Sequence, residues 1–550
     1  MSLTIAAHAA AQAYGYPLLI KQLLHTTLTQ ASSQEIVYAD RFRYTYADFN
    51  RRIQRLANTL AGLGVAMGDT VAVMDWDSHR YLESYFAVPM MGSVLFNVNV
   101  RLSEDQIVYT MNHARPKVLL LNAEFLPVFN DIRAQLESVE QVILLNDGEP
   151  IDPASLNLAG EYEAMLAASA DCFAFPDFDE NTRATTFYTT GTTGLPKGVF
   201  FSHRQLVLHS LSAALGLASS AEHGRLHRED VYMPITPMFH VHAWGIPYIA
   251  TLLGIKQVYP GRYLPDTLLK LIEQEQVTFS QCVPTILHML LNHPRAKSMD
   301  LTGLKMVIGG SALTLGLGEQ ALSRGIDVFV GYGMSETCPI MSLSRLTHAQ
   351  LQLSAAEQIP LRIKTGQAIP LVDLRIVDDQ MADLPHNGSR TGEVVVRAPW
   401  LTQGYLHNPA ASDELWADGY LHTNDIGMMD EHGVLQITDR LKDVIKTGGE
   451  WISSLELESL LTSHPAVSEC AVIAIPDAKW GERPLALVVL KPGENASAED
   501  LRAHMLGFAE QGHISRWAVP EHIRFVDALA RTSVGKLNKR ALREQFVDSQ

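Results

Sequence analysis

The stretch Thr185-Thr186-Phe187-Tyr188-Thr189-Thr190-Gly191-Thr192-Thr193-Gly194-Leu195-Pro196-Lys197-Gly198-Val199 runs from a strand pattern into a loop of threonines and glycines that ends at a lysine. Threonine hydroxyls donate hydrogen bonds, glycines let backbone N–H groups turn toward a ligand, and lysine adds a mobile positive charge. This composition favours a polyphosphate-binding loop. It is not a Walker A loop, because Pro196 stands in place of the second glycine and Gly198 follows the lysine. A Gly/Thr-rich surface turn has the same composition, so other parts of the chain must distinguish the two.

Length and charge limit the classes of protein that fit. The chain has 550 residues, too many for a single hydrophobic core, so two or more domains are expected. Its formal net charge of −17 disfavours a general nucleic-acid binder, which would carry a basic excess. No nucleic-acid partner is therefore predicted, and an anionic ligand must be met by a few local lysines and arginines.

Cysteines and apolar stretches bear on the compartment. Cys172, Cys282, Cys338 and Cys470 form no CxxC pair, which is typical of reduced, mostly buried thiols in a cytoplasmic protein. The alanine-rich N-terminal segment has no basic region and does not resemble a signal peptide. The apolar run at 84–100 is interrupted by proline and asparagine, so no integral membrane segment is predicted, while a peripheral membrane association stays open.

The first part of the chain alternates helical and strand patterns. An amphipathic helix at 46–63 is followed by buried strand patterns at 70–75, 117–122 and 141–146, which indicates layered α/β subdomains with parallel sheets. Ser202 is expected to cap a helix over 203–218. The strand patterns at 305–310 and 327–333 end in glycines, where α/β sheets place ligand-binding loops.

The pattern changes after residue 373. Short strands separated by Asp, Gly and Asn turns, at 374–378, 393–397 and 434–438, predict a β-barrel-like antiparallel subdomain. A polar, basic junction follows. We therefore predict a large adenylation domain over 1–438, a hinge over 439–446 and a small, mobile α+β domain over 447–550, in which Ser453 and Glu456 form a capping box that opens a helix.

Five further motifs accompany the Thr/Gly loop. They are Gly309–Leu313, Gly331–Thr337, Thr423–Asp425, Asp439–Glu450 and Arg531–Lys536. In this order and spacing the motifs resemble those of the adenylate-forming superfamily, and specifically its acyl-CoA synthetases of the medium- and long-chain fatty-acid type. The resemblance covers roughly residues 46–540. It implies an AMP-forming acid–thiol ligase with ATP and CoA as co-substrates.

The resemblance also implies a nucleotide site. Tyr332 would stack on adenine, and Asp425 would accept hydrogen bonds from both ribose hydroxyls, for which an acceptor-only carboxylate is suited. Asn424 departs from the family, which usually has glycine before this aspartate. The implied nucleotide-binding residues are Thr190, Gly191, Thr192, Thr193, Lys197, Gly310, Gly331, Tyr332, Ser335, Asp425, Arg440, Lys446 and Trp451.

Catalytic roles are implied for a smaller set. Lys536 resembles the adenylation lysine, although Leu529-Ala530 precedes Arg531 where many members have proline. Lys442 resembles the hinge about which the small domain pivots. Glu336 matches the ligand of Mg²⁺, with Thr189 helping on the phosphate side. The glycine pair implied to leave room for CoA is Gly448 and Gly449.

The segment Pro237-Met238-Phe239-His240 leads into the implied acyl pocket, where Trp244 resembles the gate tryptophan of fatty-acyl-CoA synthetases. His240 and His242 also fit a metal pair, but the sequence places no third ligand nearby. The predicted reaction joins a medium- or long-chain fatty acid to CoA through acyl-AMP. The alternatives are a short thioether or aryl acid, transfer to a carrier-protein thiol, and a non-enzymatic nucleotide sensor. Relatives are often dimers, so the resemblance also suggests a homodimer.

Overall fold

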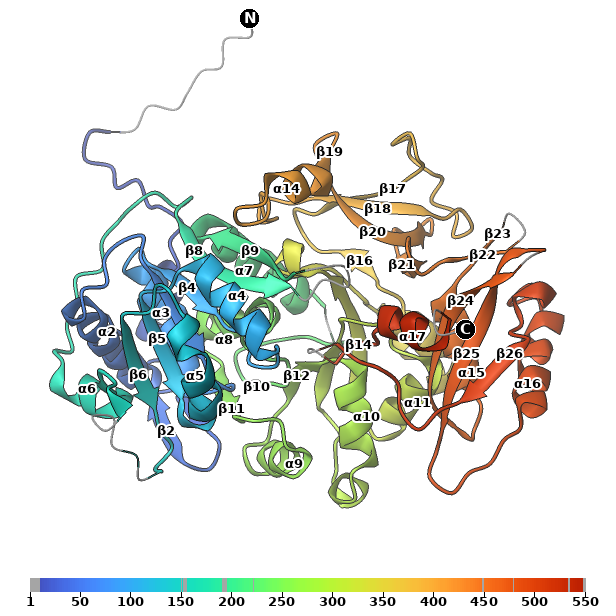
Figure 1. Cartoon of the computed structure of the whole chain (residues 1–550), viewed down its shortest axis with the longest axis horizontal. Coiled ribbons are helices and arrows are strands. Elements are labelled where there is room, and N and C mark those ends of the chain that lie inside the picture. Colours follow the sequence, from blue (N-terminus) through green and yellow to red (C-terminus); the bar gives the residue numbers. More distant parts are fainter. Residues whose placement is uncertain are drawn as a thin grey trace, which may run out of the picture.

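The described residues form four sheets, arranged in a large body and a smaller tail domain (Figure 1). The computed structural model describes residues 10–149, 151, 156–189, 195–220, 222–447, 450–477, 479–532 and 535–547. In Figure 1 the large body runs from the blue to the yellow-brown part of the chain, and the tail is orange to red.

Two predominantly parallel sheets form the large body, as the alternating patterns predicted. The first is parallel except for its last pair. Its strands, in spatial order, are β7 (Gly160–Glu161), β6 (Gln141–Leu145), β5 (Val118–Asn122), β3 (Thr70–Met74), β4 (Val94–Asn97), β8 (Arg183–Thr189) and β9 (Lys197–Ser202). The predicted phosphate loop therefore joins two antiparallel neighbours at an edge of this sheet.

The second sheet has a parallel centre and antiparallel edges. Its strands, in spatial order, are β16 (Gln367–Ala368), β15 (Ile340–Leu343), β14 (Asp327–Gly333), β13 (Lys305–Ile308), β12 (Phe279–Cys282), β10 (Val231–Pro234), β11 (Lys256–Tyr259), β1 (Glu35–Tyr38) and β2 (Phe42–Thr45). The glycine-ended strands β13 and β14 lie side by side, so their two glycine motifs meet at one end of the sheet.

Helices cover and connect these sheets. Those of the large body are α1 (Gln22–Gln30), α2 (Tyr46–Gly62), α3 (His79–Met90), α4 (Glu104–Ala114), α5 (Leu126–Ile132), α6 (Tyr162–Ala168), α7 (His203–Ala218), α8 (Ile246–Leu253), α9 (Pro265–Gln274), α10 (Pro284–Asn292), α11 (Leu315–Ser323), α12 (His348–Leu351), α13 (Ala355–Arg362) and α14 (Pro409–Leu415). Helix α7 has the predicted bounds. It begins after Ser202 because Ser202 Oγ accepts a hydrogen bond from the N–H of Gln205, while the Gln205 side-chain oxygen accepts one from the N–H of Ser202.

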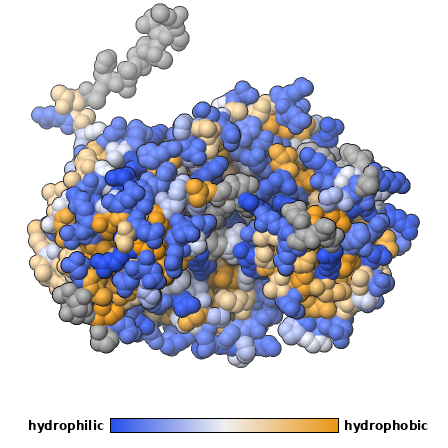
Figure 2. All heavy atoms as spheres, in the orientation of Figure 1, coloured by the Kyte–Doolittle hydropathy of each residue, from blue (hydrophilic) through white to orange (hydrophobic). Residues whose placement is uncertain are grey.

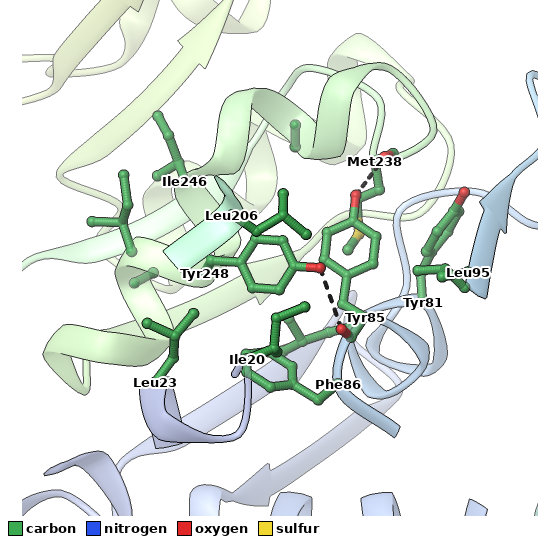
Figure 3. Close-up of a cluster of buried hydrophobic side chains, with 14 of the residues drawn as sticks. Ile20, Leu23, Tyr81, Tyr85, Phe86, Leu95, Leu206, Met238, Ile246 and Tyr248 are labelled. Atoms are coloured by element: carbon green, nitrogen blue, oxygen red, sulfur yellow. Dashed lines mark hydrogen bonds between the residues drawn. The ribbon is translucent and has the colours of Figure 1, made fainter. Parts of the chain in front are cut away.

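The core between the two large sheets is aromatic (Figure 3). Tyr85 of α3 and Tyr248 of α8 stack with ring centroids 5.2 Å apart, and the Tyr248 hydroxyl donates to the Tyr85 carbonyl oxygen over 3.2 Å. The Tyr85 hydroxyl in turn donates to the carbonyl oxygen of Met238. The segment that leads into the predicted acyl pocket is thus fixed to the core of the large body.

Two smaller sheets complete the molecule. An antiparallel sheet of β17 (Asp373–Val377), β18 (Gly392–Arg397), β20 (Tyr420–Met429), β19 (Trp416–Ala417) and β21 (Leu435–Arg440) occupies the region predicted as barrel-like. The tail sheet contains β23 (Glu450–Ile452), β22 (Ile445–Thr447), β25 (Gly481–Leu490), β24 (Val467–Asp477) and β26 (His522–Phe525). The tail helices are α15 (Ser454–Thr462), α16 (Ala498–Glu510) and α17 (Lys539–Phe546).

The junction differs in detail from the prediction. Strand β21 continues through Asp439 and Arg440, so the first two residues of the predicted hinge pair with β20. At the start of α15 the N–H of Glu456 donates to Ser453 Oγ, so Ser453 caps the helix, but the return bond from the Ser453 N–H to the Glu456 side chain, which the predicted capping box also needs, is not formed. Ser453 Oγ also donates to the carbonyl oxygen of Thr438, so this cap ties the tail to the large body.

The surface and the thiols agree with the composition. On the face shown in Figure 2, hydrophobic residues are scattered among hydrophilic ones. Within the described ranges, helices long and apolar enough to cross a membrane are absent. All four cysteines are free, and Cys282, Cys338 and Cys470 are buried, as predicted.

Candidate active site

A cavity of about 1950 Å³ lies between the large body and the tail. Both parts contribute to its wall. Twelve of the predicted site residues line it: Thr189, Lys197, His240, Gly310, Gly331, Tyr332, Ser335, Glu336, Asp425, Arg440, Lys442 and Lys536. Residues up to 347 positions apart in the sequence, from Thr189 to Lys536, therefore face one space.

One corner of the cavity is built by β14, β20 and β21. The register of β20 and β21 pairs Asp425 with Arg440, and the Arg440 guanidinium lies 3.3 Å from the Asp425 carboxylate. The Tyr332 hydroxyl, from the end of β14, donates to the other Asp425 oxygen over 2.7 Å. The carboxylate raises the pKa of Arg440, and burial together with Asp425 raises the pKa of Tyr332. The corner thus presents an aromatic ring beside a buried anion that can accept further hydrogen bonds.

The backbone conformation of Asn424 suits an asparagine in place of the glycine usual at this position of the family. Its φ angle is +57°, in the left-handed region that glycine and, among other residues, asparagine adopt most easily. Asp425 is only 7% exposed, and its N–H donates a hydrogen bond to Thr423 Oγ1 over 3.1 Å. The substitution of glycine by asparagine therefore preserves the backbone bend that directs Asp425 into the cavity.

Another part of the cavity wall contains Thr189, Lys197 and Glu336. The Glu336 side chain is buried and accepts a hydrogen bond from the Tyr405 hydroxyl over 2.7 Å. The Lys197 ammonium lies 4.8 Å from the centre of the Tyr405 ring, a cation–π distance. A backbone bond from Leu406 N–H to the Gly198 carbonyl oxygen, 2.8 Å long, ties the two segments together. A carboxylate, a lysine and the half-buried Thr189 thus share this wall.

Tyr405 is a site residue that the sequence reasoning missed. It lies 69 positions after its partner Glu336 and carries no motif of its own. The local signal around it, Gly404-Tyr405, is an ordinary turn pattern. Four predicted residues, Thr190, Gly191, Thr192 and Thr193, lie outside the described residues, so the structure adds nothing to their assignment.

Lys536 projects from the tail into the cavity. A Cβ atom placed on Gly310 would come within 3.1 Å of Lys536 Cε, so the glycine leaves the space in which the lysine chain lies. Burial lowers the pKa of Lys536 to about 8, and the charge of Arg440 acts in the same direction, while Asp425 and Glu336 oppose it. The lysine is still mainly protonated at pH 7 and contributes a positive charge near both acidic residues.

The segment after His240 has an unusual backbone. Val241, His242, Ala243 and Trp244 have φ angles of +42°, +59°, +47° and +61°, a left-handed turn without glycine until Gly245. Each such residue is strained by roughly 1–2 kcal/mol. The turn is held by Gln281 Nε2, which donates to the Ala243 carbonyl oxygen over 3.1 Å. Strain of this kind persists where surrounding contacts enforce it, and it marks candidate functional segments.

Trp244 and His240 occupy different positions on this segment. Trp244 is 5% exposed, and a Cβ on Gly309 would meet its Cη2 atom at 3.0 Å, so the indole packs behind the glycine loop and does not line the cavity. His240 lines the cavity, and burial lowers its pKa to about 3. His242 is buried instead beside Thr185 Oγ1, 2.9 Å away. The described residues contain no cluster of three metal-ligating side chains.

The structure describes only some of the residues predicted for the hinge, the closure over the nucleotide and the CoA site. Lys442 is exposed at the cavity rim, whereas Lys446 lies on β22, does not line the cavity, and donates its N–H to Glu482 over 2.7 Å. Gly448 and Gly449, predicted at the CoA site, are outside the described residues, and so is the side chain of Trp451. Lys446 is therefore separated from the nucleotide corner in this domain orientation.

The geometry is that of an adenylate-forming enzyme, and comparison of the whole chain agrees with it. The model of the AMP-binding enzyme family matches residues 24–406, and the model of the AMP-binding enzyme C-terminal domain matches residues 456–536. The chain therefore belongs to the AMP-binding enzyme family, as the motifs predicted. It is an AMP-forming acyl-CoA synthetase.

Three relatives illustrate the similarity. A long-chain-fatty-acid–CoA ligase of Thermus thermophilus is 44% identical over 92% of this chain and 90% of its own. A 3-methylmercaptopropionyl-CoA ligase of Ruegeria lacuscaerulensis is 37% identical over 97% of this chain and 98% of its own. The solved structure of ATP-bound MatB from Rhodopseudomonas palustris superposes with a TM-score of 0.81, at 26% identity over 97% of this chain and 99% of its own.

Proposed function

We propose that the chain activates a medium- or long-chain fatty acid as acyl-AMP and transfers the acyl group to CoA, releasing AMP and pyrophosphate. The observation that carries this proposal is the meeting of the Tyr332–Asp425–Arg440 corner, Glu336 and Lys536 in one cavity. Tyr332 would stack on adenine, and Asp425 would accept from the ribose hydroxyls. Of the other predicted nucleotide residues, Lys197, Gly310, Gly331 and Ser335 also line this cavity.

The preference for an apolar acid follows from the neutrality of the acyl segment. Phe239 and Trp244 are buried hydrophobic side chains, and His240 is uncharged at pH 7 because its pKa is lowered to about 3. Uncharged side chains along this segment suit an alkyl chain. The thioether acid named for the Ruegeria relative is the second candidate, since it is also uncharged beyond its carboxylate.

In the first half-reaction the fatty-acid carboxylate attacks the α-phosphorus of ATP, and pyrophosphate leaves. Negative charge spreads over the phosphate oxygens, and Lys536 and Lys197 supply fixed positive charge on two sides of the cavity. The site otherwise acts by positioning, because the corner fixes the nucleoside while the loop holds the phosphates.

The residues present fit Mg²⁺ bound together with ATP. Glu336 offers a buried carboxylate at the cavity wall near Thr189, which suits an ion that takes one or two protein oxygens and fills its other positions with phosphate and water. Mg²⁺ held by Glu336, with Thr189 on the phosphate side, would neutralise phosphate charge. Tyr405 would keep the Glu336 carboxylate oriented by its hydrogen bond.

In the second half-reaction the tail domain would rotate about Lys442. This movement would withdraw Lys536 and admit CoA past Gly448 and Gly449, so that its thiolate attacks the acyl carbonyl and AMP leaves. The orientation seen here, with Lys536 in the cavity, suits the first half-reaction. A homodimer and a cytoplasmic location remain proposals that rest on the resemblance and on the free thiols.

Measuring the two half-reactions separately tests the proposal. Pyrophosphate release over a series of fatty, thioether and aryl acids identifies the acid. With the best acid, Lys536→Ala should lose at least about a hundredfold in acyl-adenylate formation while it still converts supplied acyl-adenylate to thioester. Lys442→Pro should do the reverse, because proline restricts the φ angle about which the tail turns. Equal losses in both half-reactions for each variant would contradict the assigned roles.

A further inference from the structure

A threonine of the large body is hydrogen-bonded to the loop that carries Lys536. Thr285 stands in the first turn of α10, directly after Pro284. Its hydroxyl donates to the carbonyl oxygen of Gly535 over 3.1 Å, one residue before the lysine. In Figure 1 the red loop that precedes α17 reaches toward the green helix α10, in agreement with this contact.

Arg531 completes the contact from the tail side. Its Nη1 donates to Thr285 Oγ1 over 2.6 Å and to the Gly535 carbonyl oxygen over 3.0 Å. Its Nη2 forms an ion pair with Glu469 of β24 at 2.6 Å, so a contact within the tail also holds the guanidinium that bonds to Thr285. Thr285 is therefore bonded both to the arginine and to the backbone beside Lys536.

The Lys536 loop is tight enough to transmit this contact. The Thr532 N–H donates to the Lys536 carbonyl oxygen over 2.8 Å, and the Gly535 N–H donates to the Thr532 carbonyl oxygen over 2.9 Å. The Lys536 N–H lies 3.2 Å from Thr532 Oγ1. A loop closed by these bonds moves as a unit, so fixing Gly535 also fixes the backbone of Lys536.

We propose that Thr285 is a positioning residue that docks the Lys536 loop for acyl-adenylate formation and has no part in thioester formation. The inference rests on the proposed role of Lys536. Thr285 belongs to the large body, whereas Arg531, Gly535 and Lys536 belong to the tail, so rotation about Lys442 separates the partners. The contact can therefore serve only the orientation in which Lys536 lies in the cavity.

The test compares Thr285→Val, which keeps the shape of threonine without its hydroxyl, with Thr285→Ser, which keeps the hydroxyl. Both half-reactions are measured with the acid that wild type uses best, the second from supplied acyl-AMP and CoA. Thr285→Val should slow acyl-adenylate formation about tenfold, the effect of a lost hydrogen bond to a charged group. Thioester formation should stay within about twofold of wild type, and Thr285→Ser should recover adenylation.

Two further variants separate the possible failures. Thr29→Val, at an exposed α1 threonine whose hydroxyl bonds only to the preceding turn, should leave both half-reactions unchanged. If Lys536→Ala loses adenylation while Thr285→Val does not, or if Thr285→Val slows both half-reactions equally, the positioning role is overturned. If Lys536→Ala itself retains adenylation, the proposed function of the lysine fails, and the docking role fails with it.

Discussion

Replacing Gly310 by alanine tests how closely the tail lysine fits the glycine loop. Gly310 has a φ angle of +78°, at which alanine is strained by roughly 1–2 kcal/mol. Its added Cβ would also lie 3.1 Å from Lys536 Cε and 3.2 Å from Val283 Cγ1. Both distances are shorter than the roughly 3.5–4.0 Å at which two carbon atoms make their best van der Waals contact. The lysine chain must therefore shift by a few tenths of an ångström.

The expected activity follows from that shift. Because a displacement of about 1 Å costs roughly a hundredfold in rate, a few tenths should reduce acyl-adenylate formation by roughly threefold to tenfold. Thioester formation from supplied acyl-AMP should be spared, since the proposed rotation of the tail would withdraw Lys536 from the cavity for that step. Single-turnover pyrophosphate release and thermal unfolding, measured on the same samples, give the rate and the stability.

Gly303 offers the matched control. Its φ angle is +86°, but a Cβ there would meet no atom within 4 Å. Gly303→Ala should therefore lower the unfolding temperature as Gly310→Ala does, with adenylation unchanged. Equal adenylation rates in the two alanine variants would refute the reasoning, because backbone strain alone would then explain the Gly310 result.

Two other predictions concern charge and orientation. The pKa of Lys536 is lowered to about 8, so kcat/KM for adenylation should decline as the pH rises above 8 and the lysine loses its proton. Lys536→Arg stays charged and should remove that decline. An unchanged decline in the variant would assign the pH dependence to another group. Tyr405→Phe removes the 2.7 Å hydrogen bond to Glu336 and should raise the Mg²⁺ concentration for half-maximal adenylation about tenfold. The control Tyr420→Phe loses a 2.8 Å hydrogen bond to Asp373 outside the cavity and should leave that concentration unchanged. Equal Mg²⁺ dependence in the two variants would count against the role of Tyr405.

Local signals in the sequence predicted the elements that local chemistry controls. Helix α7 begins at His203 because Ser202 and Gln205 cap each other, and the two residues are only three positions apart in sequence. Strand β14 ends at Gly333 as predicted, since its apolar run stops at a glycine motif. The residues that line the cavity were predictable in part, because those found there from the predicted set sit inside short motifs whose order along the chain is distinctive.

Long-range pairings were not predictable in the same way. Strand β1 was missed because its partner β11 begins more than 200 residues later. Tyr405 was missed because what marks it as a site residue is its hydrogen bond to Glu336, which the sequence does not reveal. The left-handed turn at 241–244 contradicts the usual rule that positive φ requires glycine. It exists because contacts such as that of Gln281 enforce it, and these contacts become visible only in three dimensions.

The packing at the domain boundary would keep the energetic cost of the proposed tail rotation low. In the part of the chain that the structure describes, no hydrophobic cluster combines residues from both sides of Arg440: the tail clusters begin at Ile445, and those of the large body end at Leu435. The named contacts across the boundary are instead polar, such as Ser454 N–H and Oγ donating to Asp439, each over 2.6 Å. Each such bond to a carboxylate contributes only about 1.5–3 kcal/mol net, because water replaces it when it breaks. A tail with its own core, held by exchangeable hydrogen bonds, can therefore deliver Lys536 and withdraw it without unfolding, as the two-step proposal requires.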